Sequence, residues 1–150
     1  MAIRHIPDGY HAITPSFSVE GAQKFIDFVT HVFNAKTRMR MDGPGGKILH
    51  AELEIGDSVI MVGDAQPQWP AKSNSVYVYV EDVDAAYRRA LKLGASSVRE
   101  PENAFYGDRG SAVLDPFGNS WGIATHVEDV PPDELKRRAE EFQKKMAGAK

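Results

Sequence analysis

Hydrophobic and polar positions divide the chain into two halves with the same order of elements. Residues 10–19 alternate as a strand does, and residues 20–33 then place apolar side chains at three- and four-residue steps, as an amphipathic helix does. Three more strands are expected at 36–41, 47–55 and 58–63, with glycine-containing turns between them. The first half therefore predicts a β-α-β-β-β unit.

The same order returns after a polar connector at 65–74 that contains prolines. Residues 75–80 alternate cleanly, and residues 83–95 have helical spacing that turns Leu91 and Leu93 inward. Gly94 marks the end of that helix, because glycine readily adopts the left-handed conformation. The remaining strands are expected at 96–99, 105–114 and 120–125.

Short sequence matches support an internal repeat. The segment Val19-Glu20-Gly21-Ala22 returns as Val80-Glu81-Asp82-Val83, and Gly56-Asp57-Ser58 returns as Gly118-Asn119-Ser120. One such unit has a sheet face that its single helix only partly covers, so two units are expected to pair.

We therefore predict a single α+β domain over residues 1–150, in which two βαβββ modules form a cup-shaped curved sheet with helices outside. Module one spans 8–64 and module two spans 75–127. A C-terminal helix at 131–147 follows, with a narrow apolar stripe that docks either on the body of its own chain or on a partner subunit. The stripe consists of Leu135, Ala139, Phe142 and Met146.

Composition narrows the choice of partners. Of the 150 residues, 18 are Lys or Arg and 21 are Asp or Glu, and the net charge of −3 argues against nucleic acid as the main partner. The absence of cysteine excludes disulfides and thiolate metal sites. No apolar run has the length of a membrane span or resembles a secretory signal, so we expect a soluble, cytoplasmic protein.

The paired modules, with Asp115-Pro-Phe-Gly-Asn119 closing the second, resemble the vicinal oxygen chelate superfamily of glyoxalase I, bleomycin-resistance proteins, fosfomycin-resistance enzymes and extradiol dioxygenases. Residues 106–110, 115–121, 123–126 and 128–130 look like its PhnB-like branch. This resemblance implies a cup built from two curved sheets, in a homodimer. The sequence leaves open whether the modules pair within one chain or between two.

The resemblance also implies four positions where the metal enzymes of the superfamily carry ligands. They fall here on Thr14, Glu52, Ser75 and Gly122. Hydroxyls are poor ligands for transition metals, glycine offers no ligand atom, and a single carboxylate does not hold such a metal. We therefore predict neither a metal nor another cofactor.

Three polar side chains share one face of the strand at 47–55, namely His50, Glu52 and Glu54. His50 and Glu52 could clamp a metal or form an oriented base. The simpler interpretation is a solvated face of an antiparallel sheet, which the alternation favours.

Aromatic side chains supply the other candidate contacts. Tyr77 and Tyr79 share a face, where they either stack on a ligand or pack across strands. Trp69 either caps the cup or pins the connector. Tyr106 and Arg109 lie beside two glycines that suggest a bulge.

Arg109 has two interpretations. Its planar fork suits a carboxylate or phosphate of a ligand, and an ion pair with Asp108 or Glu102 is the alternative. Trp121 is expected in the core. His11, His31 and His126 show no pattern that assigns them a role, and no catalytic residue can be named.

These features predict a metal-free protein that binds a small molecule, and that sequesters an aromatic antibiotic or metabolite. The expected ligand-binding residues are His50, Glu52, Trp69, Tyr77, Tyr79, Tyr106 and Arg109. One alternative is a lyase, isomerase or dioxygenase of the same superfamily, using His50 and Glu52 with a divalent metal or Glu52 alone as a general base. A metal version would need another ligand, such as His11. The other alternative is an interaction module whose contact is the 131–147 helix.

Overall fold

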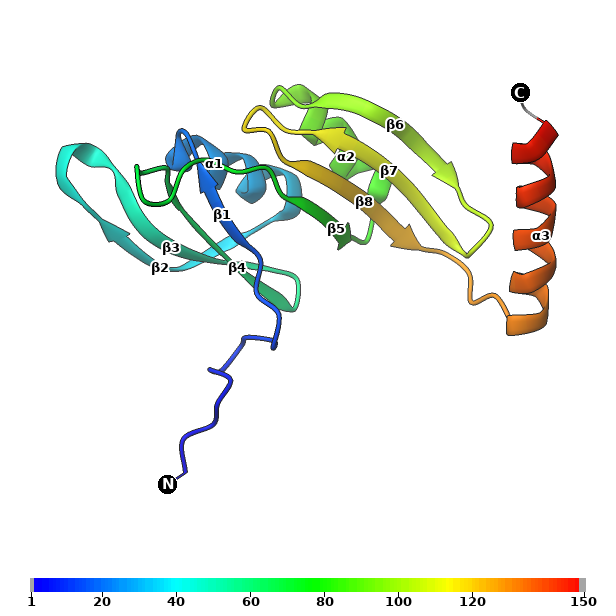
Figure 1. Cartoon of the computed structure of the whole chain (residues 1–150), viewed down its shortest axis with the longest axis horizontal. Coiled ribbons are helices and arrows are strands. Elements are labelled where there is room, and N and C mark those ends of the chain that lie inside the picture. The colour runs from blue at the N-terminus through cyan, green and yellow to red at the C-terminus, as the bar shows by residue number, and fades with distance from the viewer. Residues whose placement is uncertain (1, 149–150) are drawn as a thin grey trace.

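The β-α-β-β-β order predicted for each half is confirmed in a computed structural model, which describes residues 2–148 (Figure 1). The first module consists of β1 (Ser16–Val19), α1 (Ala22–Phe33), β2 (Lys36–Asp42), β3 (Ile48–Ile55) and β4 (Ser58–Asp64), with a single 3-10 turn at Pro44–Gly46. The second consists of β5 (Ser75–Tyr79), α2 (Val83–Lys92), β6 (Ser96–Asn103), β7 (Asp108–Leu114) and β8 (Ser120–His126). Helix α3 (Pro132–Gly148) follows.

Each module forms a four-stranded sheet with the same connectivity. The strand order is β1-β4-β3-β2 in the first sheet and β5-β8-β7-β6 in the second. In each sheet the first and last strands of the module pair in parallel, and the other pairs are antiparallel. The sequence repeat is therefore a structural repeat.

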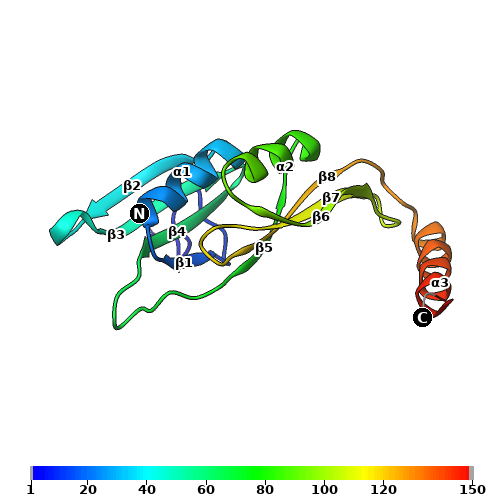
Figure 2. The ribbon, with the colours of Figure 1, turned by 90° about the horizontal axis from the view of Figure 1, so that it is seen from above.

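Helices α1 and α2 lie on the same side of the two sheets, which leaves the opposite side of each sheet without a helix (Figure 2). The core lies under the helices and joins the modules. Trp121 of β8 is fully buried, stacks on Phe17 of β1 with 5.5 Å between ring centroids, and lies 5.0 Å from the ring of Phe33 in α1. The prediction of Trp121 as core is confirmed, and one side chain of module two thus completes the core of module one.

Two expected details are wrong. The strand predicted over 10–19 begins only at Ser16, and Ile13 is 86% exposed, because β1 has a neighbour in the sheet only from Ser16, opposite Met61. Pro15, which has no N–H to donate, precedes it. Leu93 is exposed because α2 ends at Lys92, and Tyr87 is buried on the helix face.

Helix α3 extends beyond the end of the second sheet (Figure 1). None of its residues is buried. It contacts its own chain through two residues in its middle: the Phe142 ring lies 5.0 Å from that of Phe105, and Arg138 forms an ion pair with Glu128 at 2.8 Å. Phe142 and Met146 of the predicted stripe remain exposed. Within residues 2–148, no helix combines the length and the hydropathy that crossing a bilayer requires.

The turn that closes the second module is built around the buried carboxylate of Asp115. It accepts hydrogen bonds from the backbone N–H of Phe117 and of Asn119, both at 2.8 Å, and from Nε1 of Trp121 at 2.8 Å. The turn therefore fixes the position of the indole that joins the two modules.

Replacing this carboxylate should be costly. Asp115→Ala leaves buried donors without an acceptor, so we expect the free energy of unfolding to fall by about 3 kcal/mol. Asp57→Ala, in the matching turn of module one, removes a well-exposed carboxylate and should change it by less than about 0.5 kcal/mol. Urea unfolding of both variants measures the difference, and equal effects would contradict this role of Asp115.

Candidate functional site

Four polar or aromatic side chains meet on the helix-free face of the second sheet. Tyr77 and Tyr79 come from β5, Asp108 from β7 and His126 from β8. The strand register brings them together, since Asp108 lies opposite His126 and Tyr77 lies opposite Gly122. We call these four residues the tyrosine–aspartate cluster.

The carboxylate of Asp108 is the centre of this cluster. Its Oδ2 accepts hydrogen bonds from the hydroxyls of Tyr77 at 2.8 Å and Tyr79 at 2.9 Å, and its Oδ1 lies 2.9 Å from Nδ1 of His126. Asp108 is 3% exposed, whereas Tyr77 is 45% and Tyr79 is 62% exposed. A buried anion thus holds two phenols whose rings remain accessible.

Small residues in the neighbouring strands make room for Tyr77. A Cβ at Gly122 would lie 3.4 Å from its ring, and one at Gly110 would lie 3.6 Å from its hydroxyl oxygen. The rings of Tyr77 and Tyr79 stack with 5.2 Å between centroids. Tyr77 therefore packs across the strands on Gly122, as one interpretation predicted, and both rings keep exposed surface; contact with a ligand stays a prediction.

His126 is held between two carboxylates. Its Nε2 lies 2.7 Å from Asp129, in the segment that follows β8. This segment crosses directly over Gly107, where φ is +102° and a Cβ would lie 2.1 Å from the carbonyl oxygen of Glu128. Since a carboxylate can only accept, both ring nitrogens donate, which requires the protonated imidazolium.

The protonation states follow from these contacts. The hydrogen bonds to Asp108 and then Asp129 raise the pKa of His126. Burial opposes ionisation of Asp108, but hydrogen bonds from His126, Tyr77 and Tyr79 outweigh it and lower its pKa. Burial and the hydrogen bond to Asp108 raise the pKa of Tyr77. The pKa of Tyr79 is raised chiefly by its own hydrogen bond to Asp108. These contacts therefore favour ionised Asp108, protonated His126 and the neutral form of both phenols.

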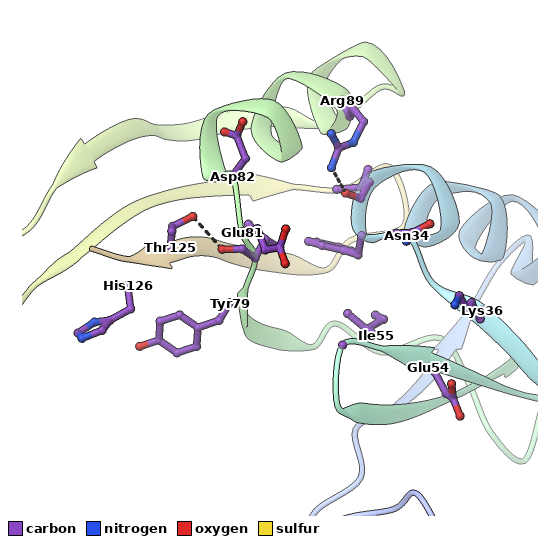
Figure 3. Close-up of a pocket in the computed structure, with 14 residues that line it drawn as sticks. Asn34, Lys36, Glu54, Ile55, Tyr79, Glu81, Asp82, Arg89, Thr125 and His126 are labelled. Carbon is purple, nitrogen blue, oxygen red and sulfur yellow. Dashed lines mark hydrogen bonds between the residues drawn. The ribbon is translucent and has the colours of Figure 1, made fainter. Parts of the chain in front are cut away.

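A cleft of about 860 Å³ lies beside the cluster, between the two modules. Tyr79 and His126 line one side, and Ile55 and Gly56 of the β3–β4 hairpin line another (Figure 3). Glu81, which follows β5, also lines it. The aromatic surface of Tyr79 is thus part of a space large enough for a small organic molecule.

Other predicted residues lie on the first sheet. His50 Nε2 is 3.3 Å from a carboxylate oxygen of Glu52. Together with Tyr10 and Arg38, Glu52 lines a separate cavity of about 450 Å³ under the N-terminal segment. Burial raises the pKa of Tyr10 to about 12, and the neighbouring Glu52 adds to this shift. The hydrogen bond with Tyr10 lowers the pKa of Glu52, although the burial of Glu52 acts in the opposite direction. Within one chain, Tyr10 and Glu52 therefore line one cavity, and Tyr79 and His126 line the other.

Arg109 and Trp69 also lie outside the cluster. Arg109 forms a two-pronged ion pair with Asp84 of α2, at 2.8 and 2.9 Å, on the helix side of the sheet. Its partner is therefore neither a ligand on the open face nor the expected Asp108 or Glu102. Trp69 is 69% exposed, and its backbone carbonyl accepts a hydrogen bond from Ser18, which pins the connector. Tyr106 lies in the turn before β7 and is partly exposed.

The sequence analysis missed the roles of Asp108 and His126. Residues 122, 124 and 126 of β8 alternate with the buried core residues Trp121 and Ile123. This alternation was visible in the sequence. The pairing of β7 with β8 in the register that joins the two side chains was not.

The side chains at the expected metal positions do not fit a metal. The ring of Tyr77 occupies the space next to Gly122, and Glu52 is engaged by His50 and Tyr10. Over residues 2–148, no group of three His, Asp or Glu side chains is arranged to hold a metal ion.

Comparison with known proteins establishes the family. Residues 11–123 match the model of the Glyoxalase/Bleomycin resistance protein/Dioxygenase superfamily. The chain belongs to this superfamily. One of its relatives is an uncharacterized protein of Mycobacterium tuberculosis (strain H37Rv), 35% identical over 136 residues that cover 83% of this chain and 80% of the relative.

Solved structures of the superfamily share the fold. TioX from Micromonospora sp. ML1 has a TM-score of 0.64 at 22% identity, covering 81% of this chain and 100% of TioX. TnmS3, an antibiotic binding protein from Streptomyces sp. CB03234, has a TM-score of 0.60 at 23% identity, covering 84% and 98%. A PhnB protein from Bacillus cereus has a TM-score of 0.60 at 16% identity, covering 77% and 99%.

The charge state of His126 can be tested directly. Its pKa should lie above the ordinary 6.5, and Asp108→Asn should lower it more than Asp129→Asn does, because Asp108 is the stronger cause. A raised folded-state pKa stabilises the protein at low pH, and this stabilisation is lost as pH rises through that pKa. Titration of the imidazole by NMR checks both statements. An unchanged His126 pKa in Asp108→Asn would refute the assignment.

Proposed function

We propose that this superfamily member is a metal-free protein that binds a planar aromatic small molecule at the tyrosine–aspartate cluster and the adjoining cleft. The observation that carries the proposal is the exposed Tyr77–Tyr79 pair, whose hydroxyls are both fixed by the buried carboxylate of Asp108. Ring surface of this kind, beside a cleft of about 860 Å³, is typical of a ligand site.

Fixing the tyrosines before binding favours affinity. A free tyrosine loses rotamer freedom when a ligand stacks on it, whereas here the hydrogen bonds to Asp108 already restrict both rings. Aromatic pairs contribute about 0.5–1.5 kcal/mol beyond the area they bury. The bound molecule would be held by contact area and would need no reacting group.

The relatives support sequestration as the biological purpose. TnmS3 is named as an antibiotic binding protein and shares the fold over 84% of this chain. We propose that this protein also binds such a molecule, and that binding sequesters an aromatic antibiotic or metabolite.

We further propose that two copies form a homodimer. The helix-free face of the first sheet exposes Met39 and Met41 and carries His50 and Glu52. In a two-fold dimer, this face of one copy would cover the tyrosine–aspartate cluster of the other. Glu52 and Tyr79, which line separate cavities within one chain, would then border one site.

An enzyme of the same superfamily is the second candidate. Glu52 lies 3.3 Å from His50 and beside Tyr10, an arrangement that could act as a general base and a proton donor in a metal-free lyase or isomerase. A metal-dependent enzyme would require ligands from a second copy. Elemental analysis of protein purified without chelators tests the metal-free proposal, and near-stoichiometric Zn, Ni, Mn or Fe would overturn it.

Binding can be tested with matched aromatic substitutions. In calorimetric titrations against planar aromatic antibiotics, Tyr79→Ala should weaken binding about tenfold, because it removes the most exposed ring of the pair. Trp69→Ala removes an exposed ring outside the cleft and should leave the affinity unchanged. Loss of affinity in Trp69→Ala alone would place the ligand elsewhere.

Sedimentation equilibrium tests the homodimer. We expect a mass twice the 16.5 kDa of one chain. Met41→Lys adds a charge to the exposed face of the first sheet and should weaken the dimer, whereas Ile3→Lys changes a residue outside both sheets and should not. A monomer at all concentrations would exclude this arrangement.

A further inference from the structure

We infer that the preferred ligand is a planar aromatic cation, which stacks on Tyr79 and directs its positive group at Glu81. This inference rests on the proposed function and deepens it, because it names the chemical class that the site selects. Three features of the cleft lead to it: the electronic state of the tyrosines, the position of Glu81, and the engagement of the nearby cations.

The tyrosine rings favour a positive partner. The face of an aromatic ring is negative and attracts cations. Both hydroxyl hydrogens point at the Asp108 carboxylate, so the ligand meets only the acceptor side of each hydroxyl oxygen. A ligand that carries hydrogen-bond donors therefore fits the rim of the rings, and an anionic ligand does not.

Glu81 is placed to receive the positive group. The hydrogen bond from the Val80 N–H to the Ala124 carbonyl, at 2.8 Å, continues the extended chain beyond β5. Glu81 comes two residues after Tyr79, where the chain bends toward α2. Figure 3 shows its carboxylate in the cleft, directed toward the end of α1 that carries Asn34. Among the described residues, Glu81 has neither a hydrogen-bond nor an ion-pair partner for its side chain.

Most cations near the cleft are already engaged. His126 lies between Asp108 and Asp129, and Arg89 donates to the carbonyl of Val32 at 2.8 Å. Lys36 is the cation that faces the cleft from β2, and Glu54 lines the same wall. On the Tyr79 side of the cleft, the carboxylates of Asp108 and Asp129 flank His126, and Glu81 adds a further negative group.

Arg99 is a cation near the other tyrosine, Tyr77. A Cβ at Gly110 would lie 3.4 Å from a guanidinium nitrogen of Arg99 and 3.6 Å from the hydroxyl of Tyr77. Arg99 approaches Glu102 at 3.9 Å and does not line the cleft. The positive charge of Arg99 would repel a cation stacked on Tyr77. We therefore assign the stacked ligand to Tyr79.

Three acridines with the same ring system distinguish the effect of ligand charge on affinity from the effect of ligand shape. At pH 7, 9-aminoacridine is a cation, acridine is largely neutral and acridine-9-carboxylate is an anion. In titrations followed by acridine fluorescence, we expect 9-aminoacridine to bind about tenfold more tightly than acridine, and the anion to bind most weakly. Added salt should weaken binding of the cation more than that of acridine.

A matched pair of variants locates the charge effect. Glu81→Gln should lower the affinity for 9-aminoacridine about three- to tenfold and leave that for acridine unchanged. Glu20→Gln makes the same change in net charge at the corresponding position of the sequence repeat, on module one, and should alter neither.

The outcomes distinguish the inference from the proposed function. If none of the three acridines binds, both the proposed function and the inference fail. If acridine binds but the cation has no advantage, or if Glu81→Gln and Glu20→Gln have equal effects, only the inference is overturned.

Discussion

The structure depends on one buried contact, the placement of Trp121 from module two among Phe17 and Phe33 of module one. Each module alone has one helix over a four-stranded sheet, and the indole is the large side chain that fills the space between them. The Asp115 carboxylate holds its N–H, so the indole is buried without an unpaired donor. Because the modules are joined under their helices, a cleft is left between them at the ends of β5 and β8.

Two buried aspartates of the second module show how one residue type serves two purposes. Asp115 accepts hydrogen bonds from backbone and indole donors that are themselves buried, and its role is structural. Asp108 accepts from tyrosines whose rings reach solvent. Burial of the acceptor together with exposure of the donor rings holds an aromatic surface at a fixed position on the open face of the sheet.

The residues at the four expected metal positions differ from a set of metal ligands. The positions where the resemblance implies metal ligands hold Thr14, Glu52, Ser75 and Gly122. The ring of Tyr77 fills the space beside Gly122. That ring provides contact area where a ligand atom would otherwise stand. The other sheet carries the contact between Glu52 and His50 at 3.3 Å.

Local periodicity and short turn motifs were enough to predict the repeated βαβββ order, the buried Trp121, the face shared by Tyr77 and Tyr79, and the C-terminal helix. Which strands lie side by side could not be predicted in this way, and the contact of Asp108 with His126 and the pairing of Arg109 with Asp84 of α2 both follow from that arrangement. Alternation along a strand predicts which residues of that strand share a face of the sheet. A hydrogen-bonded cluster of residues from several strands depends on the register between those strands. That register is set by packing of the whole core.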